Sequence, residues 1–337
     1  MIKEAILALS RKEDLSYECA EAVMHEIMTG AATPVQMSAY LTALSLKGET
    51  TTEIAASASG MRQYCIRLLH DVDALEIVGT GGDSANTFNI STTAAIITAA
   101  AGVPIAKHGN RSASGICGSA DVLEALGVNI NIAPEKSAEL LSKIGICFLF
   151  AQNYHIAMKY VAPIRRELAI RTVFNILGPL TNPAGARMEL MGVYERELVE
   201  PLAQVLCQLG VKSAMVVHGD DGLDEISLSA PTFVCEVRDG WVRSYKISPE
   251  DFGLERCDKA ALTGGDPAAN AVILRAILNG EQGAKRDLSV LNAAAAMYVA
   301  KKCETIADGV LLAQDAIDSG RAKMKLDEFV RYSNENF

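Results

Sequence analysis

The sequence lacks a long apolar run, a recognisable export signal and any CxxC pair of cysteines. Polar or charged residues interrupt every hydrophobic stretch before it reaches the ~20 residues that span a bilayer, so we expect no membrane segment. The opening residues MIKEAILALSRKED contain no small-residue cleavage site. Eight cysteines occur singly, which is typical of reduced, mostly buried thiols. These absences predict a cytoplasmic protein.

The sequence also lacks an excess of positive charge, because its formal net charge is −10. A general nucleic-acid binder would need a basic patch to replace phosphate counterions, so we expect no nucleic-acid partner. A small anionic substrate would need local cations or a bridging divalent ion. Half of the 337 residues are hydrophobic, which is enough for a large α/β unit and a smaller module.

The first 67 residues are expected to form an all-helical domain. Residues 33–36 (TPVQ) and 50–53 (TTTE) both have the form of a capping box, which marks the start of a helix. Gly30 and Gly48 fit the ends of helices.

Residues 68–337 are expected to form a larger α/β domain with a mostly parallel central sheet. Short apolar runs alternate there with Ala-rich helical stretches that end at Gly102 and Gly127. The chain is expected to be mostly helical from Asn270 on, and a segment near 160–185 to pack with the helical domain. The expected strands are 75–78, 103–106, 146–150, 214–217 and 232–237.

A glycine loop, GTGGD at 79–83, directly follows the first expected strand, and NIST at 89–92 opens the next helix. Glycines let backbone N–H groups approach a phosphate, and a helix N-terminus favours the same charge. A tight turn without a ligand is the alternative. The loop is neither a dinucleotide fingerprint, because Ser84 stands at the sixth position, nor a P-loop, because no GK[ST] follows.

Acidic residues are absent between Asp83 and Asp121, whereas Lys107, His108 and Arg111 lie in that interval. This stretch is therefore a candidate positive island that binds phosphate, with an ordinary loop as the alternative. Ser119 would cap the next helix.

Two further groups of charged residues are candidates. Asp224 and Glu225 follow an expected strand and suit a hard cation such as Mg²⁺, although a charged turn would look the same. Arg165 and Arg166 could clamp a carboxylate or face solvent, and solvent is favoured for Arg166. His218 is interpreted as a strand-end histidine with a structural partner.

Six motifs, taken in order, resemble the anthranilate phosphoribosyltransferase family: GTGGD, NIST, KHGNR, GSADVLEALG, FNILGPLTNPA and HGDDGLDEIS. The resemblance implies a nucleoside phosphorylase/phosphoribosyltransferase-like fold, a homodimer formed through the helical domain, and an active site between the two domains. It implies transfer of the phosphoribosyl group from phosphoribosyl pyrophosphate to the amine of anthranilate, with release of pyrophosphate, in tryptophan biosynthesis.

The same resemblance implies roles for individual residues. Two Mg²⁺ ions would be bound, one reached by Ser91 and one held by Asp224 and Glu225. Asn110 and Arg165 would contact anthranilate, and Lys107 and Arg165 would be the catalytic residues. The implied substrate-binding residues are Gly79, Gly82, Asp83, Thr87, Asn89, Ile90, Ser91, Thr92, Lys107, His108, Gly109, Asn110, Arg111, Ser112, Ala113, Ser114, Gly115, Ser119 and Arg165.

The reaction implied is displacement of pyrophosphate by an aromatic amine, through a transition state with oxocarbenium character. An aniline nitrogen is uncharged at neutral pH, so no protein nucleophile is needed. The protein would position the two substrates and neutralise the departing pyrophosphate with Mg²⁺, Lys107 and N–H groups.

The sequence departs from the family pattern in three places. Residues 115–117 (GIC) replace two hydroxyls and a cation near the donor, Gln152 and Ile156 replace prolines, and Ala169 replaces a glycine. A different aromatic amine acceptor is therefore an alternative. A pyrimidine nucleoside phosphorylase is a second alternative, against which the acid pair argues. A non-catalytic or nucleic-acid-binding relative is a third, which the acidic composition disfavours.

Overall fold

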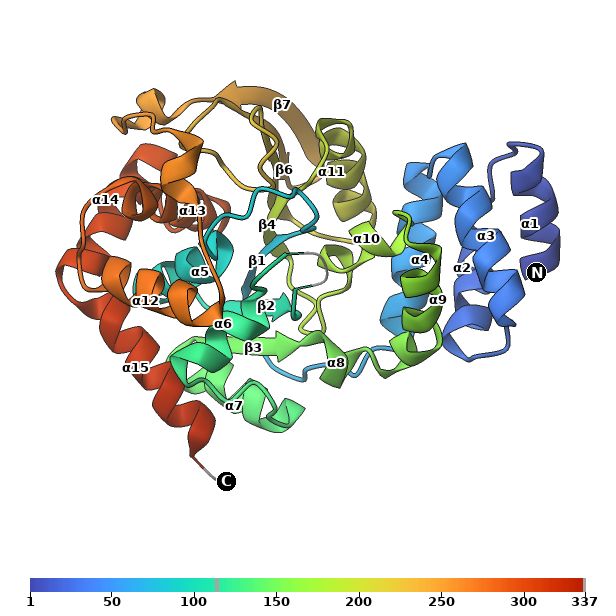
Figure 1. The fold of residues 1–337 in the computed structure, drawn as a ribbon, viewed down its shortest axis with the longest axis horizontal. Helices are drawn as coiled ribbons and strands as arrows, with labels where there is room; N and C mark the ends of the chain where they lie inside the picture. The colour runs from blue at the N-terminus through green and yellow to red at the C-terminus, as the bar shows by residue number, and fades with distance from the viewer. Residues whose placement is uncertain (113–114, 336–337) are drawn as a thin grey trace.

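The computed structural model describes residues 1–112 and 115–335, arranged as a helical bundle beside a larger α/β body (Figure 1). None of the helices in this described part is long and apolar enough to cross a membrane. All eight cysteines are free, as predicted, but only Cys147 and Cys235 are buried, so the expectation of mostly buried thiols is wrong. The bundle consists of α1 (Ile2–Ser10), α2 (Tyr17–Met28), α3 (Pro34–Lys47) and α4 (Thr51–Gln63).

Local capping sequences begin and end the helices of the bundle. The Thr33 hydroxyl accepts the Gln36 N–H while the Gln36 side chain accepts the Thr33 N–H, and Thr50 and Glu53 repeat this exchange at α4. Both predicted capping boxes are confirmed. Gly48, with φ of 88°, ends α3 in a conformation that suits glycine.

A later segment of the chain packs on this bundle. Helix α9 (Ala162–Leu168) contacts α3, and α10 (Phe174–Leu177) contacts α4. The buried side chains of Val161, Ile164 and Phe174 belong to the same hydrophobic core as α1–α4. In Figure 1 these helices lie between the bundle and the sheet.

Seven strands form one sheet in the order β3-β2-β1-β4-β5-β6-β7. Neighbouring strands are parallel from β3 to β5, whereas β6 and β7 continue the sheet antiparallel, so the expected mostly parallel sheet is confirmed. The strands are β1 (Leu75–Gly79), β2 (Ile105–Gly109), β3 (Ile146–Phe150), β4 (Met188–Gly192), β5 (Ser213–Gly219), β6 (Thr232–Arg238) and β7 (Trp241–Ile247).

Two of these strands are missing from the sequence-based prediction, and one begins later than predicted. β4 carries Glu189 and β7 is mostly exposed, so neither forms the continuous apolar run that indicates a buried strand. The predicted start of β2 at Val103 is wrong because the strand begins at Ile105. Pro104 precedes it and has no N–H to donate to a ladder.

Helices cover both faces of the sheet. Helices α5 (Ile90–Ala100) and α13 (Ala284–Val299) pack on one face, and α11 (Val199–Gln208) packs on the other and contacts α4. Gly127 ends α6 with φ of 94°, as predicted. The remaining helices are α6 (Ser119–Leu126), α7 (Pro134–Ile144), α8 (Ala151–Tyr154), α12 (Pro267–Leu278), α14 (Ile306–Asp318) and α15 (Arg321–Asn334).

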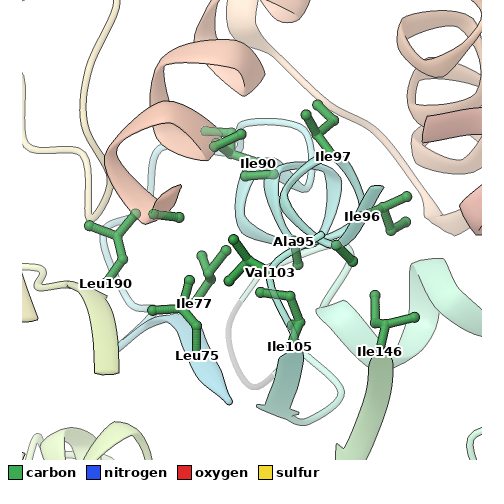
Figure 2. Close-up of a cluster of buried hydrophobic side chains, with 14 of the residues drawn as sticks. Leu75, Ile77, Ile90, Ala95, Ile96, Ile97, Val103, Ile105, Ile146 and Leu190 are labelled. Carbon is green, nitrogen blue, oxygen red and sulfur yellow. The ribbon is translucent and has the colours of Figure 1, made fainter. Parts of the chain in front are cut away.

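The core under α5 is built from alternate strand residues (Figure 2). Ile77, Ile105 and Leu190 point from three neighbouring strands toward Ile90 and Ile97 of α5, and all five are buried. Each such side chain contributes about 1.5–3 kcal/mol through burial. Because side chains alternate along a strand, the residues between them face the other side of the sheet, toward the bundle.

The strand order contains a switch point between β1 and β4. The chain proceeds from β1 to β2 and β3 on one side, and from β4 to β5 on the other. In open α/β sheets, ligands bind in the crevice beyond the carboxyl ends of the strands at such a point.

Candidate active site

A cleft of about 1130 Å³ lies at the carboxyl ends of β1 and β2, between the sheet and the segment that holds α8–α10. Thr92 does not line it, and Ala113 and Ser114 lie outside the described residues. The sequence-predicted residues that do line it are Gly79, Gly82, Asp83, Thr87, Asn89, Ile90, Ser91, Lys107, His108, Gly109, Asn110, Arg111, Ser112, Gly115, Ser119, Arg165, Asp224 and Glu225.

The glycine loop is held against the ends of neighbouring strands. The Thr80 N–H donates to the Gly192 carbonyl at 2.9 Å, and the Thr80 hydroxyl accepts the Tyr194 N–H at 3.1 Å. The Gly81 N–H donates to Asp224 Oδ2 at 2.7 Å. The Gly81 N–H is thus paired with the protein itself rather than free for a phosphate.

Asp224 and Glu225 are both buried in the loop after β5. Burial and the neighbouring Asp83 raise the pKa of Asp224 well above its usual range. Burial raises the pKa of Glu225 to about 8, although the charge of Lys107 opposes the shift. Carboxylates that lose hydration and repel one another favour a bound cation.

Oxygen donors fit magnesium better than any softer metal. The described residues contain no group of three or more His, Cys, Asp or Glu side chains that could hold a metal alone. Magnesium commonly takes one or two carboxylates and completes its shell with substrate phosphates and water, and the pair at 224–225 fits this pattern.

Lys107 lies at a place where β1 and β2 separate. Only Leu75 and Ile105 are paired between these two strands. Beyond them the buried Lys107 ammonium donates to the Ile77 carbonyl and, at 3.1 Å, to Ser91 Oγ. Burial lowers the pKa of Lys107, while the charges of Glu76, Glu225 and Asp224 oppose that shift.

Glu76 and Asn182 fill the same separation from the other face of the sheet. The Glu76 carboxylate accepts the His108 N–H at 3.0 Å, and the Asn182 amide donates both to Glu76 and, at 2.8 Å, to the Ala106 carbonyl. These two side chains replace ladder bonds that the backbone does not make. Neither residue is indicated by a local pattern in the sequence.

The predicted positive island is wrong in part. Burial and the neighbouring His155 lower the pKa of His108 to about 3, so His108 is uncharged at neutral pH. Arg111 pairs with Asp121 and Glu124, at 2.9 and 2.5 Å. Of the three residues in the predicted positive island, Lys107 is the one whose pKa is affected by Asp224 and Glu225.

The predicted cap at Ser119 is also wrong. Helix α6 begins at Ser119 itself, and Gly118 is the capping residue. The Asp121 carboxylate accepts the N–H groups of Gly118 and Ser112, at 2.9 and 3.1 Å. Asp121 at the third helical position thus supplies the carboxylate half of a capping box, by accepting the N–H of the capping residue.

Arg165 and Asn110 line the cleft from two different elements, Arg165 from α9, which packs on α3, and Asn110 from the end of β2. Arg165 is half-buried above the Phe174 ring, 5.8 Å away, and burial lowers its pKa. Asn110 Oδ1 accepts the Arg111 N–H at 2.8 Å and the Gln152 amide at 3.4 Å. Arg166 is exposed, as predicted.

His218 is confirmed as a structural strand-end histidine. It is buried, and its Nδ1 lies 2.7 Å from the Val193 carbonyl.

A second glycine segment, at residues 263–266, packs against the residues that follow the glycine loop. Thr263 forms a β-bridge with Thr87, and the Gly264 N–H donates to the Asn86 carbonyl at 3.0 Å. Asn270 accepts the Asn89 N–H at 2.9 Å. The sequence carries a signal for this segment that is absent from the predictions above, because TGGD occurs both at 80–83 and at 263–266.

Comparisons with known proteins agree with this arrangement. Residues 3–65 match the helical bundle domain of a glycosyl transferase family, and residues 71–323 match its a/b domain. The anthranilate phosphoribosyltransferase of Methanobrevibacter smithii is 63% identical over 99% of this chain and 100% of its own length.

Two solved structures share the whole fold. The anthranilate phosphoribosyltransferase of Thermus thermophilus is 45% identical and has a TM-score of 0.93, with 99% of each chain covered. The Saccharomyces cerevisiae enzyme, in complex with PRPP and Mg, is 28% identical and has a TM-score of 0.90, with 98% of this chain and 97% of that chain covered.

Proposed function

This chain belongs to the glycosyl transferase family of the anthranilate phosphoribosyltransferases, and from that premise we propose which of its residues carry out each part of the reaction. The enzyme transfers the phosphoribosyl group of phosphoribosyl pyrophosphate to the amine of anthranilate, in tryptophan biosynthesis. The observation that carries the assignment of roles is the buried acid pair beside Lys107 at the switch point.

Phosphoribosyl pyrophosphate is assigned to the space between the glycine loop and the start of α5. Asn89 lines this space, and its Oδ1 is buried and has no hydrogen-bond partner among the described residues. Buried polar atoms without partners cost free energy unless a ligand satisfies them. The N-terminus of the 11-residue helix α5 adds a favourable field for phosphate.

Asp224 and Glu225 would hold magnesium, together with the hydroxyl of Ser91 and oxygens of the substrate. The relative from Saccharomyces cerevisiae contains PRPP and Mg, which supports a magnesium-dependent donor here. When bound, magnesium would neutralise charge on the departing pyrophosphate. We propose that two magnesium ions are bound.

Anthranilate is assigned to the part of the cleft near Asn110 and Arg165. Arg165 has no acidic partner among the described residues, so its guanidinium can take the anthranilate carboxylate. Phe174, which lies under Arg165, and Met158 also line the cleft and offer apolar surface to the ring. His108 and His155 are uncharged at neutral pH, so neither offers a positive charge that would bind the anthranilate carboxylate in place of Arg165.

The residues of this chain would contribute to the reaction by positioning the two substrates and by stabilising the leaving group. The amine attacks the anomeric carbon as pyrophosphate leaves, and the amine proton is lost to solvent or to the released pyrophosphate. Lys107 would lie beside the leaving group and stabilise it by hydrogen bonding, and its Nζ donates to Ser91 Oγ at 3.1 Å, which holds Ser91 in place. No side chain needs to form a covalent intermediate.

The finer organisation remains a proposal. We assign residues 1–67 and the segment near 160–185 to one helical unit, and the rest of 68–337 to the α/β unit, in a cytoplasmic homodimer. Leu7, Val35 and Leu46 are exposed on α1 and α3, which supports contact between two bundles. A groove of about 550 Å³ lies between the same two helices.

Fluorescence-detected consumption of anthranilate, with phosphoribosyl pyrophosphate and with or without magnesium, tests the function. Magnesium-dependent loss is expected. No loss despite binding of phosphoribosyl pyrophosphate would favour a different aromatic amine, and phosphorolysis of a nucleoside would favour the phosphorylase alternative.

Three variants test the assigned roles. Lys107→Ala should lower kcat at least about a hundredfold, as removal of one preorganised charge-stabilising donor does. Arg165→Ala should raise the KM of anthranilate at least about tenfold through loss of a charge-assisted contact. Arg166→Ala, a neighbouring exposed arginine, is the matched control. Unchanged kinetics for both Lys107→Ala and Arg165→Ala would contradict the assignment.

A further inference from the structure

Arg171 lies outside the cleft lining, behind the glycine loop, and contacts three separate segments. One guanidinium nitrogen donates to the Gly82 carbonyl at 2.7 Å, and another donates to Glu195 Oε1 at 2.5 Å. The guanidinium also lies 3.8 Å from the centre of the Tyr194 ring. The backbone carbonyl of Arg171 accepts the hydroxyl of Ser45, in α3, at 2.9 Å.

The geometry requires an arginine rather than any cation. A planar guanidinium can stack on a ring while its edge donates in two directions. A lysine ammonium has no flat face and carries its three donors on one nitrogen, so it does not reproduce two separated donor nitrogens together with stacking on Tyr194. Glu195 and Tyr194 follow β4 directly and fix the direction in which the guanidinium points.

The bond to Gly82 completes a set of three anchors on one loop. Thr80 is tied to the end of β4, Gly81 to Asp224, and Gly82 to Arg171. The first two anchors belong to the sheet and its loops. The third comes from the segment that directly follows α9 and therefore from the same stretch as Arg165.

We propose that Arg171 is a positioning residue that holds the Gly82–Asp83 end of the donor loop, which is the glycine loop at residues 79–83. Arg171 also links that loop to α3 and to the segment that carries Arg165. This role rests on the proposed function, because it assumes that the loop binds phosphoribosyl pyrophosphate. The loop is preorganised when Gly82 is anchored, so donor binding does not have to order it.

Steady-state kinetics of Arg171→Lys and Arg171→Ala, with each substrate varied in turn, test the role. The KM of phosphoribosyl pyrophosphate should rise about tenfold in both variants, which corresponds to about 1.4 kcal/mol. The kcat should stay within about twofold, and the thermal midpoint within about 2 °C, because the side chain is half exposed. Glu195→Gln should have a smaller effect, since Gly82 and Tyr194 still hold the guanidinium.

Two controls separate the possible failures. Arg196→Lys alters an exposed arginine that stacks on Phe233 at 3.9 Å, and its donor KM should not change. Asp83→Asn alters the donor loop itself. An unchanged donor KM in Arg171→Lys, with a raised one in Asp83→Asn, would overturn the role of Arg171 alone. Unchanged values in both would overturn the donor assignment as well.

Discussion

Glu76 should make the enzyme less stable as pH rises, and Glu76→Gln should remove that effect. The side chain is fully buried between β1 and β2. Burial raises its pKa to about 7, although Lys107, the His108 N–H and the Asn182 amide all oppose the shift. Glu189 on β4 pairs with Glu76 in the sheet register and is also a buried acid. It therefore brings no positive charge that would stabilise an ionised Glu76.

The sign follows from proton binding. The folded pKa of about 7 exceeds the ordinary value of 4.5, so the folded state binds more protons than the unfolded state between these two values. Stability is therefore lost as pH rises through this window. With these two pKa values, the Glu76 contribution falls by about 2 kcal/mol between pH 5.5 and 8.5.

Urea denaturation without magnesium, at pH 5.5 and 8.5, measures this contribution. A glutamine keeps the shape and an acceptor for the His108 N–H but cannot ionise. Between pH 5.5 and 8.5 the free energy of unfolding should therefore fall by about 2 kcal/mol more in the wild type than in Glu76→Gln. Glu167→Gln, on the exposed side of α9, controls for the loss of one charge. Equal pH dependence in wild type and Glu76→Gln would refute the reasoning.

Two further substitutions test backbone geometry. Ala169 ends α9 with φ of 51°, which costs an L-residue about 1–2 kcal/mol, so Ala169→Gly should raise the free energy of unfolding by about 0.5–1 kcal/mol after the entropy of glycine is counted. Unchanged or lower stability in urea would count against this. Gly192→Ala would place a methyl 1.6 Å from the Asp224 carbonyl and should cost more than about 3 kcal/mol, whereas Gly178→Ala, with no atom within 4 Å, should not. Equal losses would contradict the packing argument.

Features that depend on a few consecutive residues could be predicted from the sequence. The capping boxes at Thr33 and Thr50 need only a four-residue exchange of hydrogen bonds, and Gly127 needs only a left-handed C-terminus. Apolar runs located five strands, and the glycine loop and acid pair were located because each follows a strand.

Features that depend on distant pairing could not be predicted in this way. The separation of β1 from β2 brings Asn182 to Glu76 across more than a hundred residues, and no local pattern indicates it. Burial and the neighbouring His155 keep His108 uncharged even though the Gly178 carbonyl opposes this shift in its pKa, and a count of basic residues cannot include these effects. β4 escaped detection because Glu189 interrupts its apolar pattern while facing a buried environment.

The glycines at the strand ends explain why the site loops can lie so close to the sheet. Four of the five parallel strands end in glycine, at Gly79, Gly109, Gly192 and Gly219. A methyl group at any of them would meet an atom of the site loops within 2.5 Å: Asp224 at two of them, and Ser119 and Asp221 at the others. None of the four has a left-handed φ, so these glycines serve close approach rather than turning. The carboxyl edge of the sheet is thus shaped to receive the protein's own acid pair, which in turn fixes where a cation and its phosphate ligand can bind.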